Sequence, residues 1–406
     1  MNTISAVRSQ FPALERKVYG KPLVYLDNSA TTQKPLGVLE VLKEMEGGLN
    51  GNIHRAVHYL SARCTERYEE AREAIRSYIN AAHTHEILFT SGTTASINML
   101  AFSFGETYIK PGDRIVVTDA EHHSNIVPWQ MLCARKQAQL CVWHVNEQGE
   151  LPLEALDDLL DAKLLAVTHV SNVLGIVNPL AEIIKKAHSY GVPVLVDGAQ
   201  GIVHGPVDVQ ALDVDFYAFS GHKLYGPTGT GVLYGKESFL EKMVPWQGGG
   251  DMIDTVSLTK GTTYAPLPMK FEAGTANYIG AAALGAAIGF MQSLDKTWFQ
   301  SHEQQLVAEG MARLQTIEGL RILGTPVQAA KVPLFTMTIE GAHPNDVALL
   351  LDQMGIAVRS GQLCAEPLLE RFGQTAVLRA SFGVYNTLDE LDYLVSSLKK
   401  VLGMLR

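Results

Sequence analysis

The stretch DFYAFSGHKLYGPTGTGVLYG, residues 215–235, is the strongest indication of the fold class in the sequence. An apolar run of strand type ends at Ser220, and Gly221, His222 and Lys223 follow at once. A second apolar run, GVLYG, closes the stretch. A buried strand that ends directly in a polar glycine turn is typical of open α/β sheets, whose ligands lie beyond the carboxyl ends of the strands.

Further apolar runs of the same kind precede this stretch, and helical patterns such as LAEIIKKAHSYG (180–191) lie between several of them. The runs are EILFT (86–90), DRIVVTD (113–119), KLLAVTHV (163–170) and VPVLVDG (192–198). Strands that alternate with helices predict an α/β domain with a mixed, mostly parallel sheet that is covered on both faces.

The pattern changes near residue 277, where NYIGAAALGAAIGFMQSL predicts a long helix that joins two domains. Beyond it we expect a helix over 304–316, strands near Phe335 and Val358, and a final helix over 388–402, which together make a smaller α+β domain. The expected division is an N-terminal segment (1–25) that packs with the small domain, a large domain (26–295) and a small C-terminal domain (296–406).

Composition limits the functional classes. The chain has 406 residues, 47% of them hydrophobic and 18% charged, and a formal net charge of -9. This balance favours a large core, while the acidic charge argues against nucleic acid or an anionic membrane as the main partner. With no apolar run of membrane-spanning length and no secretory pattern at the start, we expect a cytoplasmic protein.

The four cysteines are Cys64, Cys133, Cys141 and Cys364, and none forms a CxxC pair. Neither a zinc site nor a disulfide framework is therefore indicated. Cys364 differs from the others because it lies in a polar glycine turn, in GIAVRSGQLCAEPLL (355–369). Cysteine is most often a small buried hydrophobe, but a turn favours exposure, and the nearby Arg359 and Arg379 could activate a thiol or bind a carboxylate.

Lys223 is the first candidate for covalent chemistry. Most lysines are solvated surface residues, but here a strand end, His222 and a glycine-rich continuation come together. A lysine that forms a Schiff base must be neutral part of the time, and burial can lower such a pKa to about 7–8. Asp197, at the end of an apolar strand, could then pair with the protonated ring nitrogen of a carbonyl-bearing cofactor. The alternative is that its side chain caps the next turn.

Two further segments fit an anionic, aromatic ligand. In SGTTASINML (91–100), Thr93 and Thr94 would open a helix, whose free N–H groups form an anion site, although a threonine cap is common. In EHHSNIVPW (121–129), only one of the two adjacent histidines can face a given site, where it could stack on a ring and move protons. A metal site would need further ligands, and the sequence offers no suitable cluster.

Taken together and in this order, the segments resemble the class V aminotransferase family of fold-type-I pyridoxal-phosphate (PLP) enzymes. More closely, they resemble the cysteine desulfurases of the branch that includes the SufS and CsdA proteins. The similarity covers nearly the whole chain. Its segments are YLDNSATTQKP (25–35), GNIHRAVHYLSA (51–62), SGTT (91–94), EHHSNIVPWQ (121–130), THVSNVLG (168–175), VDGAQ (196–200), FYAFSGHKLYGPTG (216–229), WQGGGDMI (246–253), FEAGT (271–275), RSGQLCAEPLL (359–369) and LRASFGVYNT (378–387).

The resemblance implies a role for each candidate. Lys223 would form the Schiff base and move the Cα proton, and Cys364 would attack the substrate sulfur, which leaves alanine and a Cys364 persulfide. The expected cofactor contacts are His122 on the ring, Asp197 at the ring nitrogen, Gln200 at the phenolic oxygen, Thr93, Thr94, Ser220 and His222 around the phosphate, Asn172 beside the cofactor, and Thr275 at the phosphate of the other subunit. Asn172, Arg359 and Arg379 would hold the substrate carboxylate.

The implied partners are L-cysteine or L-selenocysteine, a second copy of the chain and a sulfur-acceptor protein, which would serve iron–sulfur cluster assembly or a related pathway. Two positions depart from the family pattern: Leu363 stands where histidine is common before the cysteine, and Ala276 stands where proline is common. The alternatives are a selenocysteine lyase, another PLP enzyme (a kynureninase-like hydrolase, an epimerase or an aminotransferase) and a scaffold that has lost catalysis.

Overall fold

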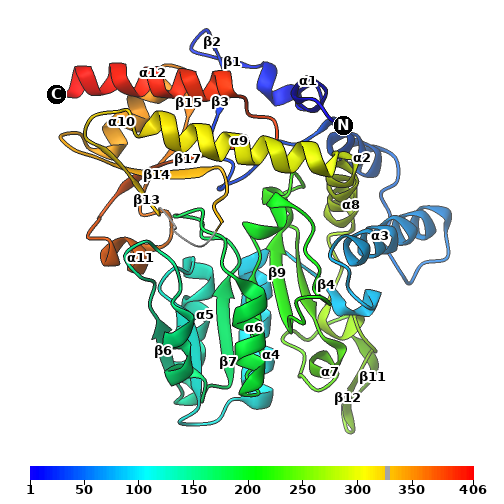
Figure 1. The fold of residues 1–406 in the computed structure, drawn as a ribbon. Coiled ribbons are helices and arrows are strands. Elements are labelled where there is room, and N and C mark those ends of the chain that lie inside the picture. The colour runs from blue at the N-terminus through cyan, green and yellow to red at the C-terminus, as the bar shows by residue number, and fades with distance from the viewer. Residues whose placement is uncertain (325–329) are drawn as a thin grey trace.

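The computed structural model describes residues 1–324 and 330–406, which form a large α/β part beneath a smaller α+β part (Figure 1). The large part contains a seven-stranded sheet in the order β4-β10-β9-β8-β7-β5-β6. These strands are β4 (Ile87–Thr90), β5 (Arg114–Thr118), β6 (Gln139–Trp143), β7 (Leu164–Thr168), β8 (Val194–Asp197), β9 (Phe216–Ser220) and β10 (Gly231–Gly235). The five neighbouring strands β9, β8, β7, β5 and β6 run parallel to one another, and β10 runs antiparallel to both of its neighbours, β4 and β9.

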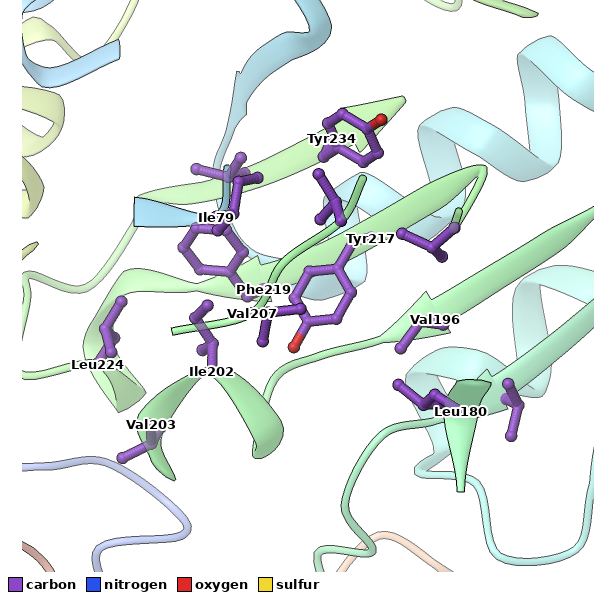
Figure 2. Packing of buried hydrophobic residues seen from close by; sticks show 14 of the residues in the cluster. Ile79, Leu180, Val196, Ile202, Val203, Val207, Tyr217, Phe219, Leu224 and Tyr234 are labelled. Carbon is purple, nitrogen blue, oxygen red and sulfur yellow. The ribbon is translucent and has the colours of Figure 1, made fainter. Parts of the chain in front are cut away.

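Alternate side chains of each strand enter different hydrophobic clusters on the two faces of the sheet. In β7, Leu165 and Val167 belong to one cluster and Leu164 and Ala166 to the other. Figure 2 shows the first face, where Tyr217 and Phe219 of β9 lie near Ile202 and Val207 in the same cluster. Because both faces are buried, the strands are continuous apolar runs, and the predicted mostly parallel sheet is confirmed.

Helices cover both faces of this sheet (Figure 1). Residues of α4 and α5 pack in one cluster, and residues of α2, α3, α6 and α8 pack in the other. The helices of the large part and its N-terminal segment are α1 (Ile4–Arg8), α2 (Leu36–Gly47), α3 (Tyr59–Tyr78), α4 (Thr93–Tyr108), α5 (Val127–Lys136), α6 (Leu180–Ser189), α7 (Glu237–Leu240) and α8 (Tyr278–Ser293). The long helix that the sequence predicts from residue 277 is α8.

The smaller part is built on a four-stranded antiparallel sheet in the order β13-β14-β17-β16. Its strands are β13 (Leu320–Leu323), β14 (Leu334–Ile339), β15 (Ile356–Ala357), β16 (Arg359–Gly361) and β17 (Val377–Ser381), of which β15 lies outside this sheet. Its helices are α9 (Lys296–Leu314), α10 (Pro344–Asp352), α11 (Glu366–Arg371) and α12 (Leu388–Leu405). A separate hydrophobic cluster packs between this sheet and the helices α9, α10 and α12, while α11 and the loop before it pack into the cluster of the large part.

The N-terminal segment contacts both regions. Val7 and Phe11 join the hydrophobic cluster of the large part, whereas β3 (Val24–Tyr25) pairs with β15 of the smaller part. The remaining short strands form two hairpins. They are β1 (Lys17–Val18), β2 (Lys21–Pro22), β11 (Ile253–Ser257) and β12 (Gly261–Tyr264). The division at residues 25 and 295 stays a prediction. Among the described residues, no helix combines the length and apolar character needed to cross a membrane.

Candidate active site

A cavity of about 210 Å³ lies at the carboxyl ends of the parallel strands, between the two regions. Asp197 and Ser220 end β8 and β9, and Thr93 opens the helix after β4. The smaller region contributes Arg359, Cys364 and Arg379 to the same cavity. The predicted site residues that line it are Thr93, Thr94, His122, Asn172, Asp197, Gln200, Ser220, His222, Lys223, Arg359, Cys364 and Arg379.

Lys223 ends the short 3-10 turn Gly221–Lys223 that follows β9 directly. Its side chain lies deep in the protein and keeps partial exposure because it borders the cavity. Burial lowers the pKa of Lys223 to about 8, while the negative charge of Asp197 opposes this shift and the positive charge of Arg379 reinforces it. The amine is therefore neutral far more often than that of a solvated lysine, as a carbonyl-binding lysine requires.

The turn that bears Lys223 is held by the segment around residues 31–34. The carbonyl oxygen of His222 accepts hydrogen bonds from the Thr32 amide (3.0 Å), the Thr31 hydroxyl (3.1 Å) and the Lys34 ammonium (3.1 Å). These contacts could not be predicted locally, because they join positions almost two hundred residues apart. They fix the backbone at the residue before the reactive amine.

Asp197 is 3% exposed, and its carboxylate accepts the Ala199 amide at 2.9 Å. Burial raises its pKa, and the charge of Lys223 acts in the opposite direction. Gln200, one turn further on, donates to the Ser29 carbonyl at 2.8 Å. A buried carboxylate at a cavity wall needs a positive or hydrogen-bonding partner, and a protonated ring nitrogen would supply both.

The Thr93 end of the cavity suits an anion. The Ser220 hydroxyl accepts the Thr93 amide at 2.8 Å and lies 2.7 Å from the Thr93 hydroxyl, at the first turn of α4. Free amides and the dipole of a long helix favour a phosphate at this position. A Cβ on Gly231 would lie 2.4 Å from the Gly92 Cα, so the close approach of β10 to this turn requires glycine. Burial lowers the pKa of His222 to about 4, so it is neutral near pH 7.

His122 is the histidine of the adjacent pair that lines the cavity. Its Nδ1 accepts the Ser124 amide at 3.1 Å, which leaves the proton of the neutral ring on Nε2. Burial, with the nearby charge of Lys223 as the next cause, lowers the pKa of His122 to about 3. A neutral imidazole at the cavity wall can stack on an aromatic ring.

Glu121 supports the turn that contains His122. This fully buried carboxyl accepts hydrogen bonds from the Thr118 hydroxyl (2.6 Å), the Asn125 amide group (2.6 Å) and the Thr168 backbone amide (2.8 Å). Burial raises its pKa to about 8. Glu121 thus joins the ends of β5 and β7 beneath the cavity, a role that the sequence did not indicate.

Arg379 supplies a buried cation to the cavity. It is 2% exposed, donates to the Asn172 carbonyl at 2.8 Å and pairs with Asp27 at 3.2 Å. Its Nε is buried without a hydrogen-bond partner among the described residues. Burial lowers its pKa to about 10, which leaves it charged near pH 7. A donor with no partner at a cavity wall suits the carboxylate of a small amino acid. By contrast, Arg359 is exposed at the edge of the cavity.

Cys364 lies in the short connection between β16 and α11 and is half-buried. It and Leu363 both have left-handed backbone angles, with φ values of 54° and 55°. The carbonyl of Leu363 accepts the Asn172 side-chain amide at 2.8 Å, and the carbonyl of Cys364 accepts the His123 backbone amide at 2.8 Å. Leu363 itself is 5% exposed and packs in the hydrophobic core, and its aliphatic side chain cannot move protons.

Thr275 is the one predicted site residue that lies apart from this cavity. It is exposed and borders a second hollow of about 270 Å³, together with Trp246 and Asn277. Its predicted contact with the other subunit concerns a second copy and stays a prediction. No group of three or more His, Cys, Asp or Glu side chains within residues 1–324 and 330–406 is arranged to hold a metal ion.

The sequence places the chain in a known protein family. The model of the family described as aminotransferase class-V matches residues 24–394, and the chain belongs to this family. It is 50% identical to a cysteine desulfurase of Cronobacter sakazakii over 401 residues, which cover 98% of both chains. It is 48% identical to a cysteine desulfurase of Serratia proteamaculans over 406 residues, with 99% of both chains covered.

Solved structures give the same result for the whole chain. The cysteine desulfurase CsdA of Escherichia coli matches with a TM-score of 0.92 and 41% identity, and the match covers 100% of both chains. The cysteine desulfurase of Thermococcus onnurineus NA1 matches with a TM-score of 0.93 and 36% identity, over 100% of this chain and 99% of the other. The predicted fold-type-I architecture is thereby confirmed.

Proposed function

We propose that this protein is a PLP-dependent cysteine desulfurase, which transfers the sulfur of L-cysteine to Cys364 and releases L-alanine. The main support is that Lys223, Arg379 and Cys364 border one cavity of about 210 Å³, although they come from different regions of the chain. The relatives that match over the full chain are cysteine desulfurases.

The residues of the cavity fit the cofactor. Lys223 is the attachment point, and its lowered pKa makes the amine available near neutral pH. Asp197 would pair with the ring nitrogen, Gln200 would bond the phenolic oxygen and His122 would stack on the ring. When bound, PLP acts as an electron sink that makes the Cα–H and Cβ–S bonds of an amino acid easier to break. Thr93, Thr94, Ser220 and His222 would hold the phosphate, and Asn172 would lie beside the cofactor.

The substrate is oriented by its carboxylate. Arg379 offers its buried Nε, Asn172 lies next to it, and the exposed Arg359 adds charge at the entrance. Lys223 takes the proton from Cα. The thiolate of Cys364 then attacks the substrate sulfur: an S–S bond forms, the Cβ–S bond breaks, and the electron pair of that bond stays on carbon, where protons complete alanine. The product on the protein is a Cys364 persulfide.

The assembled enzyme is a cytoplasmic homodimer that passes sulfur to an acceptor protein for iron–sulfur cluster assembly or a related pathway. Thr275 is exposed in one copy, and in the dimer it would reach the phosphate bound by the second copy. The β11–β12 hairpin presents exposed Val256, Leu258 and Tyr264, which suit burial against a protein surface. An acceptor thiol attacks the outer sulfur of the persulfide and restores the Cys364 thiol.

Alanine formation tests this function. The wild-type protein, loaded with PLP and supplied with a thiol reductant, is expected to release alanine and sulfide from L-cysteine in equal amounts. Cys364→Ala is expected to lose desulfuration of L-cysteine while retaining the covalently attached cofactor, and Lys223→Ala is expected to lose both desulfuration and the covalent attachment. Cys141→Ala is a matched control, because Cys141 lies in β6 outside the cavity. Unchanged alanine formation by Cys364→Ala would contradict the proposed mechanism and favour another class V reaction.

A further inference from the structure

The loop around Cys364 adopts a backbone conformation that needs external support. Leu363 and Cys364 are consecutive residues with positive φ, although both carry a Cβ that disfavours the left-handed region. A loop of this kind keeps its shape only when surrounding contacts determine it. The position of the thiol over the cavity therefore depends on what holds the loop.

Three hydrogen bonds hold the loop against the larger region. Asn172 donates to the Leu363 carbonyl, and the His123 backbone amide donates to the Cys364 carbonyl, each at 2.8 Å. In the third, the Glu366 backbone amide donates to Nε2 of His123 at 3.1 Å. Glu366 is the first residue of α11, whose early amides have no partner within the helix. His123 therefore contacts the loop at Cys364 itself, through its backbone amide, and two residues later at Glu366, through its imidazole.

His123 is separate from the groups that surround the cofactor. Unlike its neighbour His122, it is not among the described residues that line the cavity. The centres of the two imidazole rings are 6.3 Å apart and their planes differ by 49°, so the two rings do not stack on each other and face different parts of the protein. To accept the Glu366 amide, Nε2 of His123 must be unprotonated, which places the ring proton on Nδ1.

We propose that His123 is a positioning residue for sulfur transfer, because its imidazole accepts the Glu366 amide and so holds the Cys364 loop over the cavity. This inference rests on the proposed function, in which Cys364 receives the sulfur. His123 does not touch the substrate and acts only through the loop. Loss of its acceptor leaves cofactor attachment intact and slows the step in which the thiolate meets the sulfur in line.

Two substitutions isolate this acceptor. His123→Phe removes it and keeps a ring of similar shape, whereas His123→Gln keeps a side-chain oxygen that can accept the Glu366 amide. The backbone amide that bonds Cys364 is present in both. His343→Phe is the matched control, because His343 also caps a helix, α10, by accepting the Asn345 amide at 3.3 Å, away from the cavity.

The turnover of L-cysteine and L-selenocysteine by the PLP-loaded enzymes is the main readout. For His123→Phe we expect kcat with L-cysteine to fall about tenfold, with KM and the visible cofactor band little changed. Selenium leaves carbon more readily and needs less from Cys364, so kcat with L-selenocysteine is expected to stay within about twofold. His123→Gln and His343→Phe are expected to stay within about twofold for both substrates.

Alkylation provides a second readout that does not depend on turnover. Peptide mass spectrometry after timed iodoacetamide treatment is expected to show faster modification of Cys364 in His123→Phe than in the wild type or His343→Phe. An unchanged kcat with L-cysteine, or an equal fall for both substrates, would overturn the role of His123. If instead the wild type makes no alanine from L-cysteine, or Cys364→Ala keeps the activity, the proposed function fails, so the two failures are distinct.

Discussion

Titration of Lys223 offers a quantitative test of how burial prepares the site. A solvated lysine has a pKa of about 10.4, so only about 0.04% of it is neutral at pH 7. With the pKa of Lys223 lowered to about 8 by burial, about 9% of the amine is neutral at the same pH. The neutral, nucleophilic form is thus about 200 times more abundant at pH 7, and about 20 times at pH 9, than in an ordinary lysine.

The sign of the pH effect follows directly. Below about pH 8, Lys223 is mostly protonated, and covalent attachment of PLP to the apoenzyme should slow about tenfold for each pH unit. Above about pH 9 the rate should level off. The assay follows the visible absorbance of the attached cofactor after mixing PLP with apoenzyme, and a lysine model peptide measured in parallel corrects for the ionisation of PLP itself.

The ratio of the two rates is the decisive quantity. It should fall about tenfold between pH 7 and pH 9, as the solvated amine gains neutral form while Lys223 is already neutral. In Asp197→Asn the midpoint should move to lower pH, because the charge of Asp197 raises the pKa of Lys223. A ratio that stays constant over this range would refute the idea that burial lowers the pKa of Lys223.

Four substitutions test other contacts. Arg72 is 1% exposed and pairs with the buried Glu272, so Arg72→Met should lower the free energy of unfolding in urea by about 3–5 kcal/mol. Arg76 pairs with Glu73 in a more exposed position, so Arg76→Met should lower the same free energy by less than about 1 kcal/mol. Asp197→Asn should slow alanine formation about ten- to hundredfold at saturating cysteine and PLP, and a change below about twofold would count against its pairing with the ring. Arg379→Lys should raise KM for L-cysteine about tenfold or more, with a smaller effect on kcat, and an unchanged KM would exclude it as the carboxylate partner.

The parts of the fold that the sequence predicts well are those buried on both sides. The strands β4, β5, β7, β8, β9 and β10 all coincide with predicted apolar runs. The edge strand β6, QLCVW, was not predicted, because only Trp143 at its end is fully buried. Helix α9 begins at Lys296, eight residues before the expected start. Asp295 caps it, but the stretch after Asp295 lacks a clear apolar period.

The site shows a similar division between local and distant information. Asp197, Ser220 and Lys223 were predictable because the ends of neighbouring parallel strands meet at one edge of a sheet. The bond from Asn172 to Leu363 could not be predicted, because it joins segments 191 residues apart across the two regions. Similarly, Thr275 lies apart from the cavity of its own chain. Its predicted role depends on how two copies of the chain pack together, which the sequence pattern does not reveal.

Mass spectrometry of the PLP-loaded protein after brief treatment with L-cysteine, without added reductant, tests the sulfur-transfer mechanism most directly. The expected result is one extra sulfur atom on the peptide that contains Cys364, removed by a thiol reductant and not formed in Lys223→Ala. Alanine formed without this added sulfur, or sulfur found on Cys64, Cys133 or Cys141 instead, would contradict transfer through Cys364.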